Sequence, residues 1–274
     1  MQLRVGFEMV YQCPQEIPML LALNIHESRT GDLVQPDVLV IDPPVPHTTY
    51  HDLFGNQCTR LVAPPGRFTL KTDAIVEDDG LPDDYAPDAR QVPVDELPDE
   101  TLVYLLGSRY CETDQLSVAA WERFASTPRG WARVQAICDF VHQHITFGYQ
   151  YARRTRTAWE AYNEQRGVCR DYAHLGVALC RCMNIPARYC TGYITDLGIV
   201  PVPTAPMDFA GWFEAYLGDR WYTFDPRNNA PRLGRILMAR GRDACDVALA
   251  NTFGPNYLES FKVWADEHAT QTVN

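Results

Sequence analysis

Apolar and polar positions alternate along the first 80 residues of the chain. A period of two is typical of strands with one buried face, and the Pro, Gly and Asp residues between the alternating runs are typical of turns. The pattern predicts strands at residues 3–11, 19–25, 38–41, 58–63 and 68–76. We expect this region to form an antiparallel sheet or sandwich.

A helical period replaces the alternation further along the chain. Apolar residues three and four positions apart predict helices at 118–126 and 131–144, and a third helix that starts at Cys169 and ends before Pro186. Strands are expected again at 187–194, 212–217, 220–225, 235–239 and 260–264. The order of elements predicts an α+β protein, with an antiparallel β-sandwich-like domain followed by helices and a second antiparallel sheet.

The length of 274 residues suits two domains. Residues 81–100 contain four prolines, seven acids and one base, a composition typical of a linker or surface crossover. We therefore expect an N-terminal β domain over residues 1–100, with 81–100 as its acidic linker, and a core with C-terminal strands over residues 101–274. The acids of 83–100, and Glu214, are expected to be surface charges.

The formal net charge of −11 and the pI near 5.0 argue against nucleic acid or an anionic membrane as the main partner. The first residues alternate like a strand and lack the apolar centre of a signal peptide, so we expect a cytoplasmic protein. Nine cysteines without a Cys-x-x-Cys pair indicate reduced thiols and no metal site. No phosphate loop or dinucleotide fingerprint is present, so no cofactor is expected.

Cys169 is the most informative of these cysteines. It follows Gly167-Val168 and stands in the first turn of the third predicted helix. The positive end of the helix dipole favours thiolate over thiol and can lower a cysteine pKa from about 8.5 toward neutrality. Cys169 is therefore a candidate nucleophile, although free cysteines are often simply buried.

The segment 212–225 predicts a β-hairpin, because the Gly218-Asp219 turn separates two alternating runs. Counting from this turn pairs Leu217 with Arg220 and sets Trp212 opposite Asp225. Position 210 then lies on the same face as Asp225, as its diagonal neighbour about 7–8 Å away. A histidine at position 210 could be oriented by Asp225.

These motifs resemble the transglutaminase-like superfamily, in its bacterial cysteine-protease-like branch. The resemblance rests on Gly-Val-Cys-x-Asp at 167–171, Gly192-Tyr193, Trp-x-Glu at 212–214 and Trp-Tyr-x-x-Asp-Pro at 221–226, and it extends to 51–56 and 241–247. It implies a papain-like or transglutaminase-like core, preceded by the β domain that accompanies this branch. It also implies that Cys169 attacks an amide or ester carbonyl, that a histidine transfers the proton and that Asp225 orients this histidine.

The sequence departs from this pattern at Ala210, where the family strand carries the histidine. One hypothesis is an enzyme that performs amide hydrolysis or acyl transfer on a peptide-like or small amide substrate through a Cys169 thioester. A second is a catalytically impaired relative that binds a peptide, an amide or a partner protein in the same cleft. A third is a thiol chemistry in which the substrate supplies the proton shuttle.

Other residues near the motifs have less specific interpretations. His174 is expected to be structural, and Asp171 to be a first-turn acid that favours the helix dipole. Trp159 is a core residue or a wall of the cleft, and Trp212 is a possible neighbour of the site. Arg227 either pairs with Asp225 or is a solvated strand-end arginine. The histidines that could replace the absent base are those at His47, His51, His142, His144 and His174.

Overall fold

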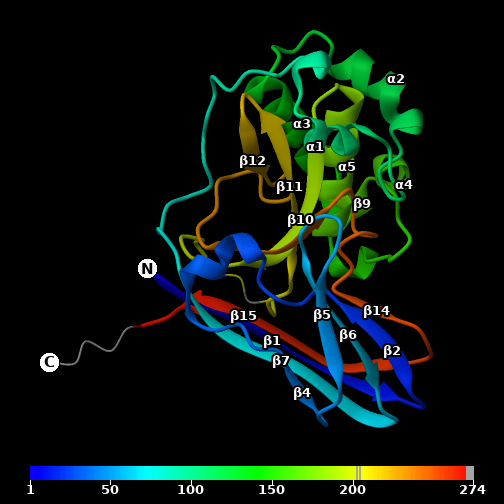
Figure 1. Ribbon diagram of the computed structural model, residues 1–274. Coiled ribbons are helices and arrows are strands. Elements are labelled where there is room, and N and C mark those ends of the chain that lie inside the picture. Colours follow the sequence, from blue (N-terminus) through cyan, green and yellow to red (C-terminus); the bar gives the residue numbers. More distant parts are fainter. Residues whose placement is uncertain (202, 204, 270–274) are drawn as a thin grey trace, which may run out of the picture.

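The computed structural model of the chain describes residues 1–201, 203 and 205–269. Its strands and helices form two regions, an all-β region and a region in which helices surround a sheet (Figure 1). The mixed α+β class predicted from the sequence is confirmed.

The β region contains two antiparallel sheets that enclose one apolar core. The first sheet has the order β15-β1-β7-β3, with β4 also paired to β7, and the second has the order β14-β2-β6-β5. Alternating burial along these strands gives the core, as in β7, whose inward positions are Phe68, Leu70, Thr72, Ala74 and Val76. The strands are β1 (Gln2–Cys13), β2 (Ile17–Leu21), β3 (Leu33–Gln35), β4 (Val40–Asp42), β5 (His47–His51), β6 (Gln57–Ala63), β7 (Gly66–Glu77), β14 (Ala250–Thr252) and β15 (Tyr257–Glu267).

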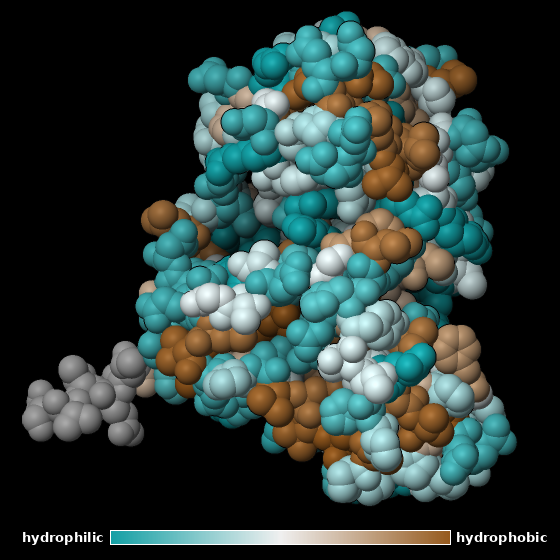
Figure 2. All heavy atoms as spheres, in the orientation of Figure 1, coloured by the Kyte–Doolittle hydropathy of each residue, from teal (hydrophilic) through white to brown (hydrophobic). Residues whose placement is uncertain are grey.

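Apolar side chains also remain on the outer surface of this region. Val40, Tyr50 and Val62 are exposed on strands of the two sheets, and the lower half of Figure 2 shows brown apolar surface among the polar residues.

The second region has a four-stranded antiparallel sheet with the order β12-β11-β10-β13 and a short parallel pair, β8-β9. Helices lie beside the four-stranded sheet in the upper half of Figure 1. The strands are β8 (Thr146–Phe147), β9 (Arg166–Gly167), β10 (Ala187–Ile194), β11 (Ala210–Leu217), β12 (Arg220–Phe224) and β13 (Arg235–Gly241). The α-helices are α1 (Asp99–Leu102), α2 (Thr113–Phe124), α3 (Trp131–His144), α4 (Ala158–Glu164) and α5 (Cys169–Cys182), and the 3₁₀ turns are η1 (Glu27–Asp32), η2 (Val94–Glu96), η3 (Val103–Leu105) and η4 (Tyr149–Tyr151).

Helix α5 is buried along almost its whole length, because it packs on β11 on one side and on the helices α2, α3 and α4 on the others. Gly176 makes the close approach to the sheet possible, since a Cβ there would lie 2.7 Å from the Phe213 ring. The helix ends as predicted before Pro186, where Asn184 takes a left-handed conformation (φ 60°). The tight packing fixes the N-terminus of α5, and with it Cys169.

The C-terminal strands differ from the expectation. The sequence predicts that they belong to the core over residues 101–274. In the structure, β15 pairs with β1 along residues 257–267 and β14 pairs with β2, so both lie in the β region. Figure 1 shows the red strand β15 beside the blue strand β1. Alternation indicates that a segment is a strand but does not name its partner, so this long-range pairing could not be read from the pattern.

Residues 81–100 are also more than a solvated linker. Val92 and Leu97 are buried in a small cluster with Tyr216, and the side chain of Asp83 is only 12% exposed because it pairs with Arg235. Glu214, expected on the surface, is largely buried and pairs with Arg188 at 2.5 Å. Burial of these acids follows from nearby arginines of the sheet, which satisfy their charge.

The predicted hairpin register is confirmed. Leu217 pairs with Arg220, Tyr216 with Trp221 and Glu214 with Thr223, and the ladder ends at Phe213 and Phe224. Asp225 therefore follows directly after β12. None of the helices in the described part of the chain has the length and apolar character needed to cross a membrane.

Candidate active site

A buried carboxylate fixes the start of α5. Asp171 accepts a hydrogen bond from the backbone N–H of Val168 at 2.9 Å and pairs with Arg156 at 3.1 Å. Gly167 is required beside it, because a Cβ at that position would lie 2.5 Å from the Asp171 carboxylate. Asp171 thus caps the helix and orients the turn that carries Cys169, in agreement with its interpretation as a first-turn acid.

Cys169 lies against the first residues of β11. The backbone N–H of Gly211 lies close enough to the sulfur to lower the pKa of Cys169. Gly211 cannot easily be replaced, since a Cβ there would come within 2.7 Å of the Tyr189 hydroxyl. The residue Cys169 is partly exposed and lines two hollows, which share Cys169, Asp208, Phe209, Ala210 and Gly211.

The thiol is less acidic than its place at a helix N-terminus predicts. Desolvation, with a smaller contribution from the negative charge of Asp208, raises the pKa of Cys169 to about 11, although the Gly211 N–H opposes the rise. Desolvation in the hollow also raises the pKa of Asp208. This direction is opposite to the expected shift toward neutrality, because burial near carboxylates disfavours the thiolate.

The smaller hollow, of about 250 Å³, lies between Cys169 and Asp225, and we call it the Asp225 hollow. Ala210, Arg227 and Asn228 also line it. The structure thus brings Cys169, Ala210 and Asp225 to one place, as the hairpin register predicts.

The carboxylate of Asp225 is already bound within the protein. It accepts hydrogen bonds from the backbone N–H of Asn228 at 3.1 Å and from its side-chain amide at 2.7 Å. Arg235 adds an ion pair at 3.2 Å and stacks over the ring of Trp212, 4.7 Å from its centroid. Trp212 is buried and lines neither hollow that Cys169 lines.

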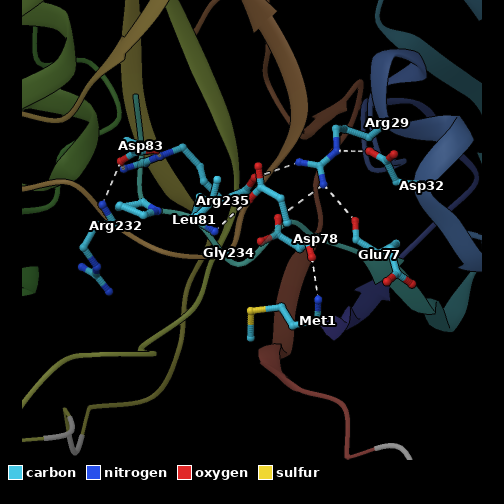
Figure 3. Close-up of a pocket in the computed structure, with 12 residues that line it drawn as sticks. Met1, Arg29, Asp32, Glu77, Asp78, Leu81, Asp83, Arg232, Gly234 and Arg235 are labelled. Carbon is cyan, nitrogen blue, oxygen red and sulfur yellow. Dashed lines mark hydrogen bonds and ion pairs between the residues drawn. The ribbon is translucent and has the colours of Figure 1, made fainter. Parts of the chain in front are cut away.

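Arg235 also links Asp225 to a neighbouring pocket of about 670 Å³ (Figure 3). Asp83 accepts two hydrogen bonds from Arg235, both at 2.9 Å, and one from the backbone N–H of Arg232 at 3.0 Å. Arg235 therefore bridges two carboxylates, and the negative charge of Asp225 is neutralised before any ligand arrives.

Arg227 was expected either to pair with Asp225 or to be solvated, and it does neither. Its guanidinium lies over the ring of Phe147, 4.3 Å from the centroid, and donates to the side-chain oxygen of Asn228 at 2.7 Å. The pairing role belongs to Arg235. Arg235 lies on β13, ten positions after Asp225, and no pattern in the sequence links the two residues.

The larger hollow, of about 880 Å³, lies on the other side of Cys169, and we call it the Arg154 hollow. One wall comes from the core, with Val168, Arg170, Tyr189 and residues 152–155. The other comes from the β region and the segment before β14, with the apolar residues Met9, Val247, Leu249, Leu258 and Phe261.

No histidine lines either hollow in the described part of the chain. His174 is buried and stacks on Tyr110, and its Nε2 accepts the backbone N–H of Ala244 at 3.0 Å. Burial holds the pKa of His174 well below its ordinary value, so the ring is neutral. Its predicted structural role agrees with these contacts.

The other histidines have partners elsewhere. His142 bonds the carbonyl of Pro226 through Nδ1 at 3.0 Å, and His144 bonds that of Tyr162. His51 pairs with Glu27, and His47 bonds the carbonyl of Val45. The sequence leaves open whether one of these histidines replaces the base absent at Ala210. None of them lines a hollow that Cys169 lines.

Trp159 does not belong to the site. It stacks on Tyr162 with ring centroids 6.0 Å apart and lines neither hollow. The described residues hold no group of three or more His, Cys, Asp or Glu side chains arranged to bind a metal ion.

Known proteins share this fold. A crystal structure from Cytophaga hutchinsonii, described as a putative cysteine protease, is 29% identical, with a TM-score of 0.84 over 100% of this chain and 92% of that one. An uncharacterized protein of Mycobacterium leprae (strain TN) is 25% identical over 248 residues, which are 87% of each chain. Residues 117–226 match the family model of the transglutaminase-like superfamily. This segment runs from α2 through Cys169 to Pro226, and it therefore forms a transglutaminase-like core.

Proposed function

We propose that the chain performs acyl transfer or hydrolysis on a peptide-like or small amide substrate through a thioester at Cys169. The observation that supports this most is the position of Cys169, which is the first residue of helix α5 and lines two hollows. A scissile carbonyl placed over the sulfur has one hollow available for each side of the bond. The relation to a described cysteine protease supports the same chemistry.

In the first step, the C–S bond forms and the C–N bond of the amide breaks, while the thiol proton moves to the leaving amine. Water or a second amine then attacks the thioester and returns the thiol. Because Ala210 cannot carry the proton, solvent or the substrate must do so. Positioned acid–base groups typically contribute about 10²- to 10⁴-fold in rate, so we expect turnover to be slow at neutral pH.

Acylation can be tested directly with p-nitrophenyl acetate, whose activated ester needs no protonated leaving group. Intact mass followed by peptide mapping is expected to show one acetyl group on Cys169 at pH 9. A matched control is Cys245→Ser, because Cys245 is exposed and lines the same larger hollow. The proposal fails if Cys169→Ala is acylated as fast as the parent chain, or if the label is found on Cys245.

A second candidate function is binding without turnover. Two observations favour it: Asp225 is occupied by Arg235 and Asn228, and the pKa of the Cys169 thiol is raised to about 11. A binding protein would retain its ligand in Cys169→Ala, and the parent chain would show no acyl-enzyme even after long incubation at pH 9. The same two measurements therefore separate the candidates.

A further inference from the structure

The charged residues that line the Arg154 hollow are Arg153, Arg154, Arg170 and Asp208, in a chain whose formal net charge is −11. Among the described residues, Arg154 and Asp208 are the two of this set that form no ion pair. An exposed guanidinium beside a nucleophile attracts anionic ligands.

Two of the three arginines are already engaged. Arg153 pairs with Glu160 at 2.8 Å and with Glu164 at 2.9 Å. Arg170 pairs with Asp171 at 3.3 Å and donates to the backbone carbonyls of residues 153 and 154. Both therefore shape the hollow and have little capacity left for a ligand.

Arg154 is different. It is exposed at the rim, and it forms no ion pair with any residue that the structure describes. The bonds from Arg170 to the carbonyls of residues 153 and 154 hold the backbone of this turn against the start of α5. The guanidinium of Arg154 is thus an unpaired positive charge, carried on a fixed backbone, that lines the same hollow as Cys169.

The opposite wall is apolar. Met9, Val247, Leu249 and Phe261 line it, together with Leu258, which is 42% exposed. An apolar side chain of a ligand would cover this surface and remove it from water. The hollow therefore offers one charged contact and one apolar contact on the same side of Cys169.

We propose that the Arg154 hollow binds an acidic peptide segment, with a ligand carboxylate on Arg154 and an apolar side chain against the wall formed by Leu258 and Phe261. This inference rests on the proposed function, because it assigns the substrate class of the same thiol site. Arg154 is then a specificity-determining residue. Guanidinium and carboxylate form charge-assisted hydrogen bonds that a neutral amide does not replace.

The test measures binding by fluorescence anisotropy in the Cys169→Ala variant. The probes are a dansyl-labelled leucyl-glutaminyl-glutamyl peptide and its matched form with glutamine in place of glutamate, both C-terminally amidated. We expect the glutamyl peptide to bind about tenfold more tightly at low salt, a difference that shrinks as salt screens the exposed arginine. Arg154→Gln is expected to remove the difference by weakening the glutamyl peptide alone.

The matched control is Arg67→Gln, which removes the same charge from an exposed position on β7 outside both hollows. It should leave both affinities unchanged. Equal affinities for the two peptides, or an equal loss in Arg67→Gln and Arg154→Gln, would overturn the inference. Since binding is measured without the thiol, this failure is separate from failure to acylate Cys169, which would overturn the proposed function.

Discussion

The two hollows beside Cys169 differ in how completely the protein satisfies its own charges. In the Asp225 hollow, the carboxylate accepts bonds from Asn228 and Arg235, and Arg235 is shared with Asp83. In the Arg154 hollow, an exposed guanidinium has no ion pair among the described residues and faces an apolar wall. Groups that are satisfied internally contribute to the fold, while unsatisfied groups remain available to a ligand. The carboxylate of Asp225 thus has its partners within the protein, whereas the charge of Arg154 has no ion-pair partner among the described residues.

The pH dependence of thiol reactivity gives the largest expected effect. Because the pKa of Cys169 is about 11, the thiolate fraction should rise about tenfold per pH unit, or about thousandfold between pH 7 and pH 10. Alkylation by iodoacetamide, followed at Cys169 by peptide mass spectrometry, measures this rise. A plateau reached below pH 9 would show that a group in the site does activate the thiol.

Restoring the family residue tests whether the Asp225 hollow can be reactivated. Ala210→His should accelerate acylation by p-nitrophenyl acetate at pH 7 about 10- to 100-fold, at or below the low end of the usual range for acid–base catalysis. The gain is limited because Arg235 and Asn228 already occupy Asp225.

The matched control for this gain is Ala210→Asn, which adds a planar polar group that does not titrate near neutral pH. It should leave the acylation rate within about threefold of the parent chain. If the histidine variant behaves like the asparagine variant, the hollow no longer serves catalysis.

Gly211 lies where the two hollows meet. Gly211→Ala should slow alkylation of Cys169 at pH 9 about fivefold, because the new methyl group displaces the Tyr189 hydroxyl or the backbone N–H that lowers the pKa of the thiol. Tyr189→Phe in the same chain should recover part of the loss. Gly31→Ala is the control, since a Cβ there meets nothing within 4 Å, and an equal loss in that variant would exclude a local cause.

Asp225→Asn should have the smallest effect on chemistry. The acylation rate is expected to stay within about twofold of that of the parent chain, because no histidine in the site needs the negative charge. The free energy of unfolding should fall by about 1–3 kcal/mol, because Arg235 loses one of its two carboxylate partners. Urea unfolding and the acylation rate measure the two quantities. If the acylation rate falls more than tenfold while the free energy of unfolding is unchanged, Asp225 takes part in catalysis.

Local patterns predicted much of this molecule. The helix at 131–144 and the strand at 187–194 have the bounds that periodicity indicates, and the Gly218 turn determines the register that places Asp225 near Ala210. These features depend on neighbours in the sequence, so the sequence alone describes them. The resemblance that begins at Cys169 then supplies the fold.

Contacts between distant residues could not be predicted in the same way. The pairing of Arg235 with Asp225 and Asp83 depends on where three separate segments meet. The pKa of Cys169 depends on burial and on Asp208, a residue far from it in the sequence. Arg154 carried no motif, and only its place on the hollow distinguishes it from the other arginines.

The pairing of β15 with β1 has a consequence for how the protein is made. Leu258 and Phe261 of β15 complete the apolar wall beside the thiol, yet they are synthesised almost 90 residues after Cys169 and about 250 after their partners in β1. Such pairing over a long stretch of chain is slow to form. During translation the nucleophile therefore leaves the ribosome well before its recognition surface exists, and ligand selection by this wall can begin only when the last strand has closed the sheet.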